Sequence, residues 1–285
     1  MLAYRFRRGL HTNGKLVQDS LMHHWIGCQI ISLFLFLAPA FAAEPAVTDI
    51  ATRPGVTQRF LLLRPAQQPV ASVVLFAGGH GGLDISPGGG FGWGAGNFLV
   101  RSRELFAQQG FTVAVVDKPS DRRDLTGFRQ TREHVADVKA LIAWLRKETG
   151  VPVWLVGTSF GTYSAAYVAS QLAPSDGGPD GIVLTSTTLT HDKIRAVPDL
   201  PVQRIAVPAL VVHHRQDGCP YCRFADVPRL MGGLTAAPAK ELIAIDGGVS
   251  KGDPCEAFSY HGYNGKEQET VASIADWIKA NTRPR

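Results

Sequence analysis

One serine in this chain stands in a setting that could make it a nucleophile. Ser159 lies in Gly157-Thr158-Ser159-Phe160-Gly161, after the apolar run 151–156 and before small residues with helical spacing. A strand that turns at once into a helix strains the residue at the turn, and glycines on either side let the two elements approach. The pattern predicts a hydroxyl displayed at a helix N-terminus, where unpaired N–H groups favour negative charge. The alternative is a tight turn capped by a serine.

A serine hydroxyl is a poor nucleophile at neutral pH, so this chemistry needs a base to take its proton and an acid to orient the base. Two loops offer these groups. Asp217 follows the strand-like run 208–214, and His261 lies in Phe-Ser-Tyr-His-Gly-Tyr, shortly before the last helical segment. The alternatives are a turn aspartate in an Asp-Gly pair and a solvated loop histidine. His214 is a candidate for a supporting role.

Strand-like apolar runs alternate with helical segments and would position these residues. The runs begin at Arg59, Ala71, Phe111, Val151, Gly181, Pro208 and Glu241. Most are continuously apolar, as is typical of strands covered on both faces. Residues 129–147 and 271–278 carry their apolar side chains on one stripe, which indicates amphipathic helices. We expect an α/β fold with a mostly parallel β-sheet and helices on both faces, in a single domain over residues 43–285.

The order of these residues resembles that of the α/β-hydrolase superfamily, and the resemblance covers nearly all of residues 43–285. In that superfamily the nucleophile, the acid and the histidine follow one another along the chain, and Ser159, Asp217 and His261 match this order. The resemblance implies that His261 deprotonates Ser159 and later protonates the leaving group, while Asp217 fixes the imidazole tautomer. Only about twenty residues separate Thr187 from Pro208, so we expect no large cap domain.

The resemblance also implies an oxyanion hole built from two backbone N–H groups. Phe160 supplies one of them, and Gly79 is the expected second donor, with His80 as its alternative. The glycine-rich segment 78–98 follows, and we expect its residues His80, Phe91 and Trp93 to bind substrate; a surface flap is the alternative. This segment does not fit the dinucleotide-binding fingerprint, and the chain has no Walker A sequence, so we expect no nucleotide cofactor.

Three cysteines lie close to the acid and histidine loops in the sequence. Cys219 and Cys222 follow Asp217, and Cys255 precedes His261 by six residues. If Asp217 and His261 are hydrogen-bonded, as the resemblance implies, a disulfide could join the two loops; we favour Cys219–Cys255 over Cys222–Cys255. Zinc-binding and redox interpretations of Cys-x-x-Cys are weaker, because zinc needs a fourth ligand at matching spacing and the redox motif belongs to a small domain.

Residues 1–42 form an N-terminal leader with a different composition. Four basic residues precede an apolar block that ends in Ala40-Phe41-Ala42. This pattern predicts a signal peptide cut after Ala42 and a periplasmic or secreted protein, with translation starting at Met1 or Met22; a retained membrane anchor is the alternative. Without the leader the chain has 25 Lys+Arg and 23 Asp+Glu, since the leader holds four of the 29 and one of the 24. We therefore expect no nucleic-acid partner.

These features together predict an exported serine hydrolase, carboxylesterase-like, that acts on a small-molecule ester or other acyl substrate. We expect no cofactor, no metal ion and no stable membrane partner after signal cleavage. Peptidase and thioesterase activities on the same three residues are alternatives, because the same triad serves several chemistries. A non-catalytic binding protein on the same fold and a thiol oxidoreductase that uses Cys219 and Cys222 are the others. The sequence does not indicate the oligomeric state.

Overall fold

The computed structural model describes residues 44–282, so the predicted signal peptide, residues 1–42, lies outside the described residues. The strands are β1 (Ala46–Arg53), β2 (Val56–Leu63), β3 (Ala71–Phe76), β4 (Phe111–Pro119), β5 (Val153–Thr158), β6 (Gly181–Thr185), β7 (Ala209–His214) and β8 (Lys240–Ile245). The helices are α1 (Phe98–Arg101), α2 (Arg103–Gln108), α3 (Arg132–Thr149), α4 (Gly161–Gln171), α5 (Val227–Gly233) and α6 (Glu267–Asn281). Within residues 44–282, no helix combines the length and the apolar character needed to cross a bilayer.

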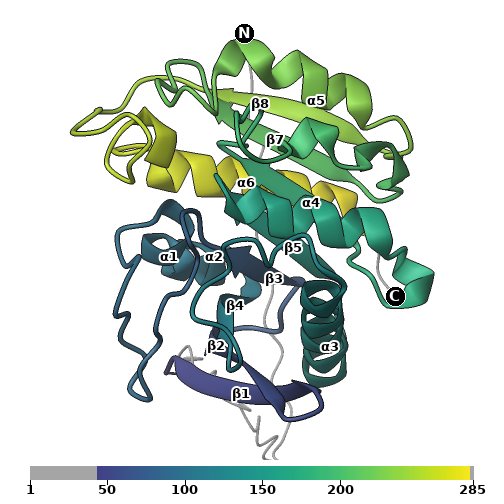
Figure 1. Ribbon diagram of the computed structural model, residues 1–285. Helices are drawn as coiled ribbons and strands as arrows, with labels where there is room; N and C mark the ends of the chain where they lie inside the picture. Colours follow the sequence, from purple (N-terminus) through teal and green to yellow (C-terminus); the bar gives the residue numbers. More distant parts are fainter. Residues whose placement is uncertain (1–43, 283–285) are drawn as a thin grey trace, which may run out of the picture. The chain divides into compact units, whose positions relative to one another are not determined.

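The strands form one eight-stranded sheet in the order β1-β2-β4-β3-β5-β6-β7-β8 (Figure 1). Neighbouring strands from β4 to β8 are parallel, whereas β2 is antiparallel to both β1 and β4. The predicted mostly parallel sheet is confirmed, with two corrections. The sequence analysis did not foresee β1, and the antiparallel ribbon that β1 and β2 form departs from a simple strand–helix–strand alternation.

Alternate residues of the central strands contribute their side chains to two hydrophobic cores, one on each face of the sheet. In β5, Val153 and Leu155 belong to the core that α3, α4 and α5 cover, whereas Trp154 and Val156 belong to the core that α1, α2 and α6 cover. All four side chains are fully buried. This is the physical reason for the continuous apolar runs, because a strand covered on both faces has no solvent-facing position.

The loops that follow β3, β5, β7 and β8 leave the same edge of the sheet, because these strands are parallel. Polar residues that are far apart in the sequence therefore meet at this edge, as ligand-binding groups do in open α/β sheets. The connection between β6 and β7 holds only the 3₁₀ turns η2 (Val197–Asp199) and η3 (Val202–Arg204). No large cap covers the edge within the described residues, as the sequence predicted.

Candidate active site

Ser159 occupies the turn between β5 and α4 in a strained backbone conformation. Its φ is +51°, in the left-handed region that a non-glycine residue adopts only at a cost. The Ser159 N–H donates to the carbonyl oxygen of Thr185 at 3.0 Å, which fixes the turn against the end of β6. The sharp turn raises the serine side chain above the carboxyl edge of the sheet.

The two glycines around this serine are required by close packing of the backbone. A Cβ on Gly157 would lie 2.4 Å from the carbonyl oxygen of Gly161, and a Cβ on Gly161 would lie 2.1 Å from that of Phe76. Real Cβ atoms do not approach another atom below 3.0 Å. The start of α4 therefore sits directly against the end of β3, and only glycine at both positions allows this approach.

Asp217 and His261 form a buried hydrogen-bonded pair. His261 Nδ1 lies 2.9 Å from Asp217 Oδ2, and the other carboxylate oxygen, Oδ1, accepts from the N–H of Cys219 at 2.9 Å. Asp217 lies in the loop after β7, and His261 lies in the 3₁₀ turn η5 (Tyr260–Gly262) after β8. An ionised carboxylate can only accept, so Nδ1 carries the proton and Nε2 is left for proton transfer when the imidazole is neutral.

Two further residues hold the histidine loop against the sheet. The Ser186 hydroxyl donates to the carbonyl oxygen of His261 at 2.7 Å. The hydroxyl of Tyr263, which is fully buried, donates to the carbonyl oxygen of Val212 and accepts from the N–H of Ser186, at 2.8 and 2.9 Å. The chain at and directly after His261 is thereby tied to Ser186, which follows β6, and to Val212 of β7.

The surroundings of His261 favour its protonated form. Burial alone would lower the pKa of His261, but side-chain hydrogen bonds with Asp217 and Cys222 outweigh burial and raise it from 6.5 to about 10. The resting imidazole therefore carries a positive charge at neutral pH. General-base chemistry uses the neutral form, so the hydroxyl of Ser159 can be deprotonated only by the fraction of His261 that has lost its proton.

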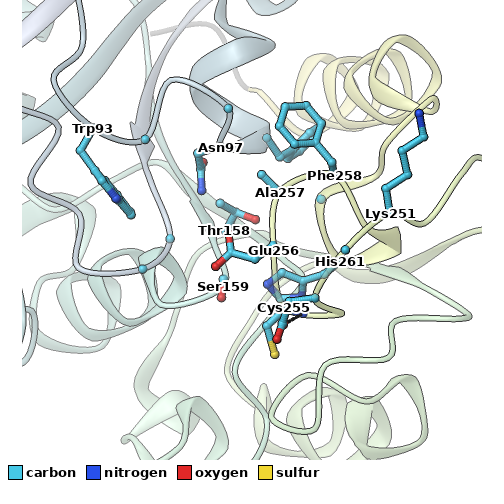
Figure 2. Close-up of a pocket in the computed structure, with 18 residues that line it drawn as sticks. Trp93, Asn97, Thr158, Ser159, Lys251, Cys255, Glu256, Ala257, Phe258 and His261 are labelled. Atoms are coloured by element: carbon cyan, nitrogen blue, oxygen red, sulfur yellow. Dashed lines mark hydrogen bonds between the residues drawn. The ribbon is translucent and has the colours of Figure 1, made fainter.

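Ser159 and His261 line the same cavity, which has a volume of about 490 Å³ (Figure 2). Trp93 lies on one side of it, and Lys251 and Phe258 lie on the other. No hydrogen bond joins Ser159 to His261 in the part of the chain that the structure describes. Catalytic hydrogen bonds are often long in the absence of substrate, and the histidine–aspartate pair is already formed.

The expected oxyanion loop lies directly beside the serine. A Cβ on Gly78 would be 3.0 Å from Ser159 Cβ, and both Gly78 and Gly79 line the cavity. Within residues 44–282, the N–H groups of Gly79, His80 and Phe160 have no backbone acceptor. These groups can therefore donate to a negatively charged oxygen, as an oxyanion hole requires.

A buried cation fixes the carbonyl groups of this loop. The Arg129 guanidinium donates to the carbonyl oxygens of Ala77 and Gly79 and to the hydroxyl of Ser164, each at 3.1 Å. No described carboxylate forms an ion pair with it. Burial lowers the pKa of Arg129 to about 9, against a smaller opposite effect of Asp124, so the side chain stays charged at neutral pH. Burying a cation without a carboxylate partner costs free energy. The three hydrogen bonds offset part of that cost, and two of them fix carbonyl groups of the oxyanion loop.

A buried carboxylate fixes the next part of the same loop. Asp117, at the end of β4, accepts hydrogen bonds from the N–H groups of Leu83, Asp84, Ile85 and Lys118 at 2.7 to 3.1 Å. The segment that follows folds back on itself, because Gly92 and Trp93 donate to the carbonyl oxygens of Asp84 and Leu83. The glycine-rich segment is therefore tied down over much of its length.

The three expected substrate-binding residues lie in different places. Trp93 lines the cavity and its ring lies 3.7 Å, centroid to centroid, from that of His80. His80 faces a neighbouring cavity of about 560 Å³, where it lies with Phe160. Phe91 lines neither cavity: it pairs with Ile85 in an isolated β-bridge, and Arg103 lies over its ring. Phe91 therefore has a packing role in this structure, and its expected contact with substrate stays a prediction.

A disulfide joins Cys219 to Cys255, the pairing that the sequence analysis favoured, and so connects the acid loop to the histidine loop. Cys222 is the free cysteine among residues 44–282, and it is buried. Donor atoms of Cys219, Cys222 and His261 lie within 4.8 Å of one another, a spacing that could suit a metal ion. The disulfide occupies the sulfur of Cys219, so this set leaves only two strong ligands, fewer than a zinc site uses.

Sequence reasoning did not find the residues that position the site. Asp117 and Arg129 support the oxyanion loop, and Ser186 and Tyr263 support the histidine loop. The available signals were an aspartate directly after an apolar strand and a tyrosine two residues after the histidine. Neither signal identifies a partner, because each partner comes from a distant part of the chain.

The sheet order and the strand–serine–helix turn define the α/β-hydrolase fold, so the expected resemblance is confirmed at the level of the fold. The chain is similar to an esterase of Pyrococcus furiosus, with 14% identity and a TM-score of 0.59 over 83% of this chain and 92% of that one. It is also similar to a Xanthomonas campestris protein described as an α/β serine hydrolase without a lid. For that protein the identity is 16% and the TM-score 0.54, over 83% of this chain and 98% of the other.

A dienelactone hydrolase-like promiscuous phosphotriesterase from metagenomic libraries is similar as well. It has 17% identity and a TM-score of 0.56, and the match covers 85% of this chain and all of the other. No protein-family model and no curated protein matches this chain. At these identities the likeness establishes the shared fold, and the chemistry has to be argued from the site.

Proposed function

We propose that this protein is a serine hydrolase that cleaves carboxylic esters through an acyl-enzyme, with Ser159, His261 and Asp217 as the triad. The observation that carries the proposal is the strained Ser159 turn on the same cavity as His261, whose Nδ1 is hydrogen-bonded to a buried carboxylate. The esterase and hydrolase descriptions of similarly folded proteins support the reaction class.

Each step of the reaction has a candidate group. His261 Nε2 takes the proton of Ser159 as the hydroxyl oxygen attacks the ester carbonyl, and Asp217 stabilises the resulting imidazolium. The N–H groups of Gly79 and Phe160 receive the negative charge on the carbonyl oxygen, and each donor is worth about 3–4 kcal/mol in transition-state stabilisation. His261 then protonates the leaving alcohol, and water completes the cycle by the same route.

The cavity suggests the kind of ester. Trp93 and Phe258 at its rim are 37% and 52% exposed, which is unusual for large apolar side chains, so an uncharged, partly apolar substrate group can rest against them. The absence of a large cap among the described elements leaves the site open. Both features favour small esters.

The test is labelling with a fluorophosphonate probe, read by intact mass, together with hydrolysis of short-chain p-nitrophenyl esters. Wild type should gain a single adduct, and Ser159→Ala should lose the adduct together with about 10³-fold or more of its turnover. Ser170→Ala, on helix α4, which follows Ser159, and with its hydroxyl bonded to the carbonyl oxygen of Tyr167, is the matched control and should behave like wild type. An unlabelled, folded wild-type protein would leave the non-catalytic binding protein as the better explanation.

Parallel assays with p-nitroanilide and thioester analogues separate the related reactions. The same three residues could serve a peptidase or a thioesterase, so the ratio of kcat/KM values identifies the bond that is cleaved. We expect the oxygen ester to be the best substrate. A higher kcat/KM for the anilide or the thioester would reassign the substrate class and keep the serine mechanism.

We also propose that the mature protein is exported and begins at Ala43, as a single domain. The leader composition and the Ala40-Phe41-Ala42 sequence support cleavage at this point. N-terminal sequencing of protein recovered from outside the cytoplasm should give Ala43 as the first residue. An intact N-terminus on membrane-bound protein would favour the retained anchor.

A further inference from the structure

The free thiol of Cys222 lies beside the disulfide that joins the acid and histidine loops. Its side chain is 1% exposed, and its sulfur lies within 4.8 Å of both the Cys219 sulfur and a ring nitrogen of His261. The hydrolytic reaction proposed above makes no use of Cys222. A buried thiol between a disulfide and a histidine is a chemically distinct arrangement, and it needs its own explanation.

The backbone around this thiol is already shaped for a bond to Cys219. The Cys222 N–H donates to the carbonyl oxygen of Cys219 at 2.9 Å, which closes a turn over Pro220 and Tyr221. The ends of such a turn have Cα atoms less than about 7 Å apart, and disulfides span about 4.4–6.8 Å between Cα atoms. A disulfide between Cys219 and Cys222 therefore needs little movement of the main chain.

A base is also in place. The Cys222 sulfur lies within 4.8 Å of a ring nitrogen of His261, and Nδ1 of that ring is bonded to Asp217. A thiol must lose its proton before it attacks a disulfide, because the thiolate is the nucleophile. His213 also holds the Cys222 main chain, since its Nε2 lies 2.6 Å from the carbonyl oxygen of Cys222.

From this arrangement we propose that Cys222 is a second nucleophile of the site, which exchanges with the Cys219–Cys255 disulfide. The neutral form of His261 takes the thiol proton, and the Cys222 sulfur attacks the Cys219 sulfur. A Cys219–Cys222 bond forms, the Cys219–Cys255 bond breaks, and the leaving Cys255 thiolate receives the proton from His261. One thiol and one disulfide are present before and after, so no external oxidant or reductant is needed.

The exchange would remove the covalent link that holds one wall of the hydrolytic cavity, the loop of Cys255. Cys255 lies in the loop that lines this cavity together with Lys251 and Phe258 and that leads to His261. With the disulfide moved to Cys219–Cys222, no covalent bond joins this loop to the loop of Asp217. The sulfur chemistry itself does not depend on the proposed function; only its effect on ester hydrolysis does.

The experiment is alkylation of the full-length protein under native conditions without reductant. The protein is incubated with N-ethylmaleimide at about pH 8, quenched with acid, digested without reduction and mapped by mass spectrometry, so that the Cys28 peptide is read separately. Cys255 is half-buried and Cys222 is buried, so alkylation traps the exchanged form. We expect label on Cys255, at least about tenfold above Cys222, and a new Cys219–Cys222 disulfide. Label on Cys222 with Cys219–Cys255 intact, or no label on either residue, overturns the proposal.

Three variants sharpen the test. Cys222→Ser has no attacking thiol, so Cys255 should stay unlabelled. Cys255→Ser leaves Cys219 and Cys222 as two thiols. Oxidised glutathione, which takes up their two electrons and two protons and leaves as two glutathione thiols, should convert them to a disulfide, so that neither reacts; free thiols at both positions after this treatment would contradict the exchange. His261→Ala should slow labelling of Cys255 about tenfold or more, if this histidine is the base. Fluorophosphonate labelling of Ser159 in the same samples keeps failure of the hydrolase function distinct from failure of the exchange.

Discussion

Replacing Gly161 by alanine tests whether the contact between α4 and β3 builds the site. The new Cβ would lie 2.1 Å from the carbonyl oxygen of Phe76 and 2.8 Å from that of Ala77. Since Cβ contacts do not fall below 3.0 Å, the two backbones must separate by at least about 0.9 Å at the first contact. Overpacking of this kind lowers the free energy of unfolding by about 1–3 kcal/mol.

The same displacement reaches the chemistry, because Ala77 is followed directly by Gly78 and Gly79 of the oxyanion loop. A misplacement of about 1 Å can cost about 10²-fold in rate. We therefore expect Gly161→Ala to lower kcat for p-nitrophenyl esters about 10²-fold, with a smaller change in KM, since the oxyanion donors act mainly in the transition state.

The matched control is Gly232→Ala, in the exposed part of α5, where an added Cβ meets nothing within 4 Å. Alanine there should stabilise the protein by up to about 1 kcal/mol and leave turnover unchanged. Urea unfolding gives the free energy of unfolding of both variants, and ester kinetics give their kcat and KM. If Gly161→Ala matched wild type in both measurements, the inference that this close approach sets the oxyanion loop would be refuted.

Three further predictions concern the histidine loop. Ester turnover, measured as kcat/KM from about pH 5 to about pH 11, should rise with pH and reach its midpoint above 6.5, because the neutral base is needed and the pKa of His261 is raised to about 10. Cys222→Ala removes one cause of that rise and should move the midpoint to lower pH; an upward move would contradict this cause. Tyr263→Phe should cost about 0.5–1.5 kcal/mol in urea unfolding, because the two buried backbone groups that its hydroxyl serves also bond to each other and are not left unsatisfied; a stability equal to wild type would argue against this role. Combined Cys219→Ala and Cys255→Ala substitutions should lower the free energy of unfolding by about 4 kcal/mol for a sequence separation of 36, and a loss below about 1 kcal/mol would show that the crosslink adds little.

The elements that could be predicted from the sequence are those with a strong local signal. The parallel strands are continuously apolar because both faces are covered, and the turn at Ser159 is marked by its two glycines. Strand β1 carries Thr48, Asp49 and Thr52 and has no fully buried residue, so its pattern is that of an edge strand and gives little apolar signal. Helices α1 and α2 are too short to establish a helical period.

The helix predicted for residues 129–147 illustrates the limit for the site. The helix begins at Arg132, after the N-cap Thr131, and Arg129 lies before it, folded inward beneath the oxyanion loop. An arginine near the start of an amphipathic helix is normally read as a surface residue. Its burial depends on the carbonyl oxygens of Ala77 and Gly79, which lie about fifty residues earlier in the chain, and no local pattern reports such a contact.

The contact between Arg129 and the loop also has an electronic consequence. A positive charge at the oxygen of a peptide group draws electron density through that group and makes its N–H a stronger donor, as in any polarised chain of hydrogen bonds. The oxygen of Gly79 belongs to the same peptide group as the N–H of His80. Arg129 therefore makes the N–H of His80 a stronger donor without touching it, and its contact with the Ala77 oxygen does the same for the N–H of Gly78.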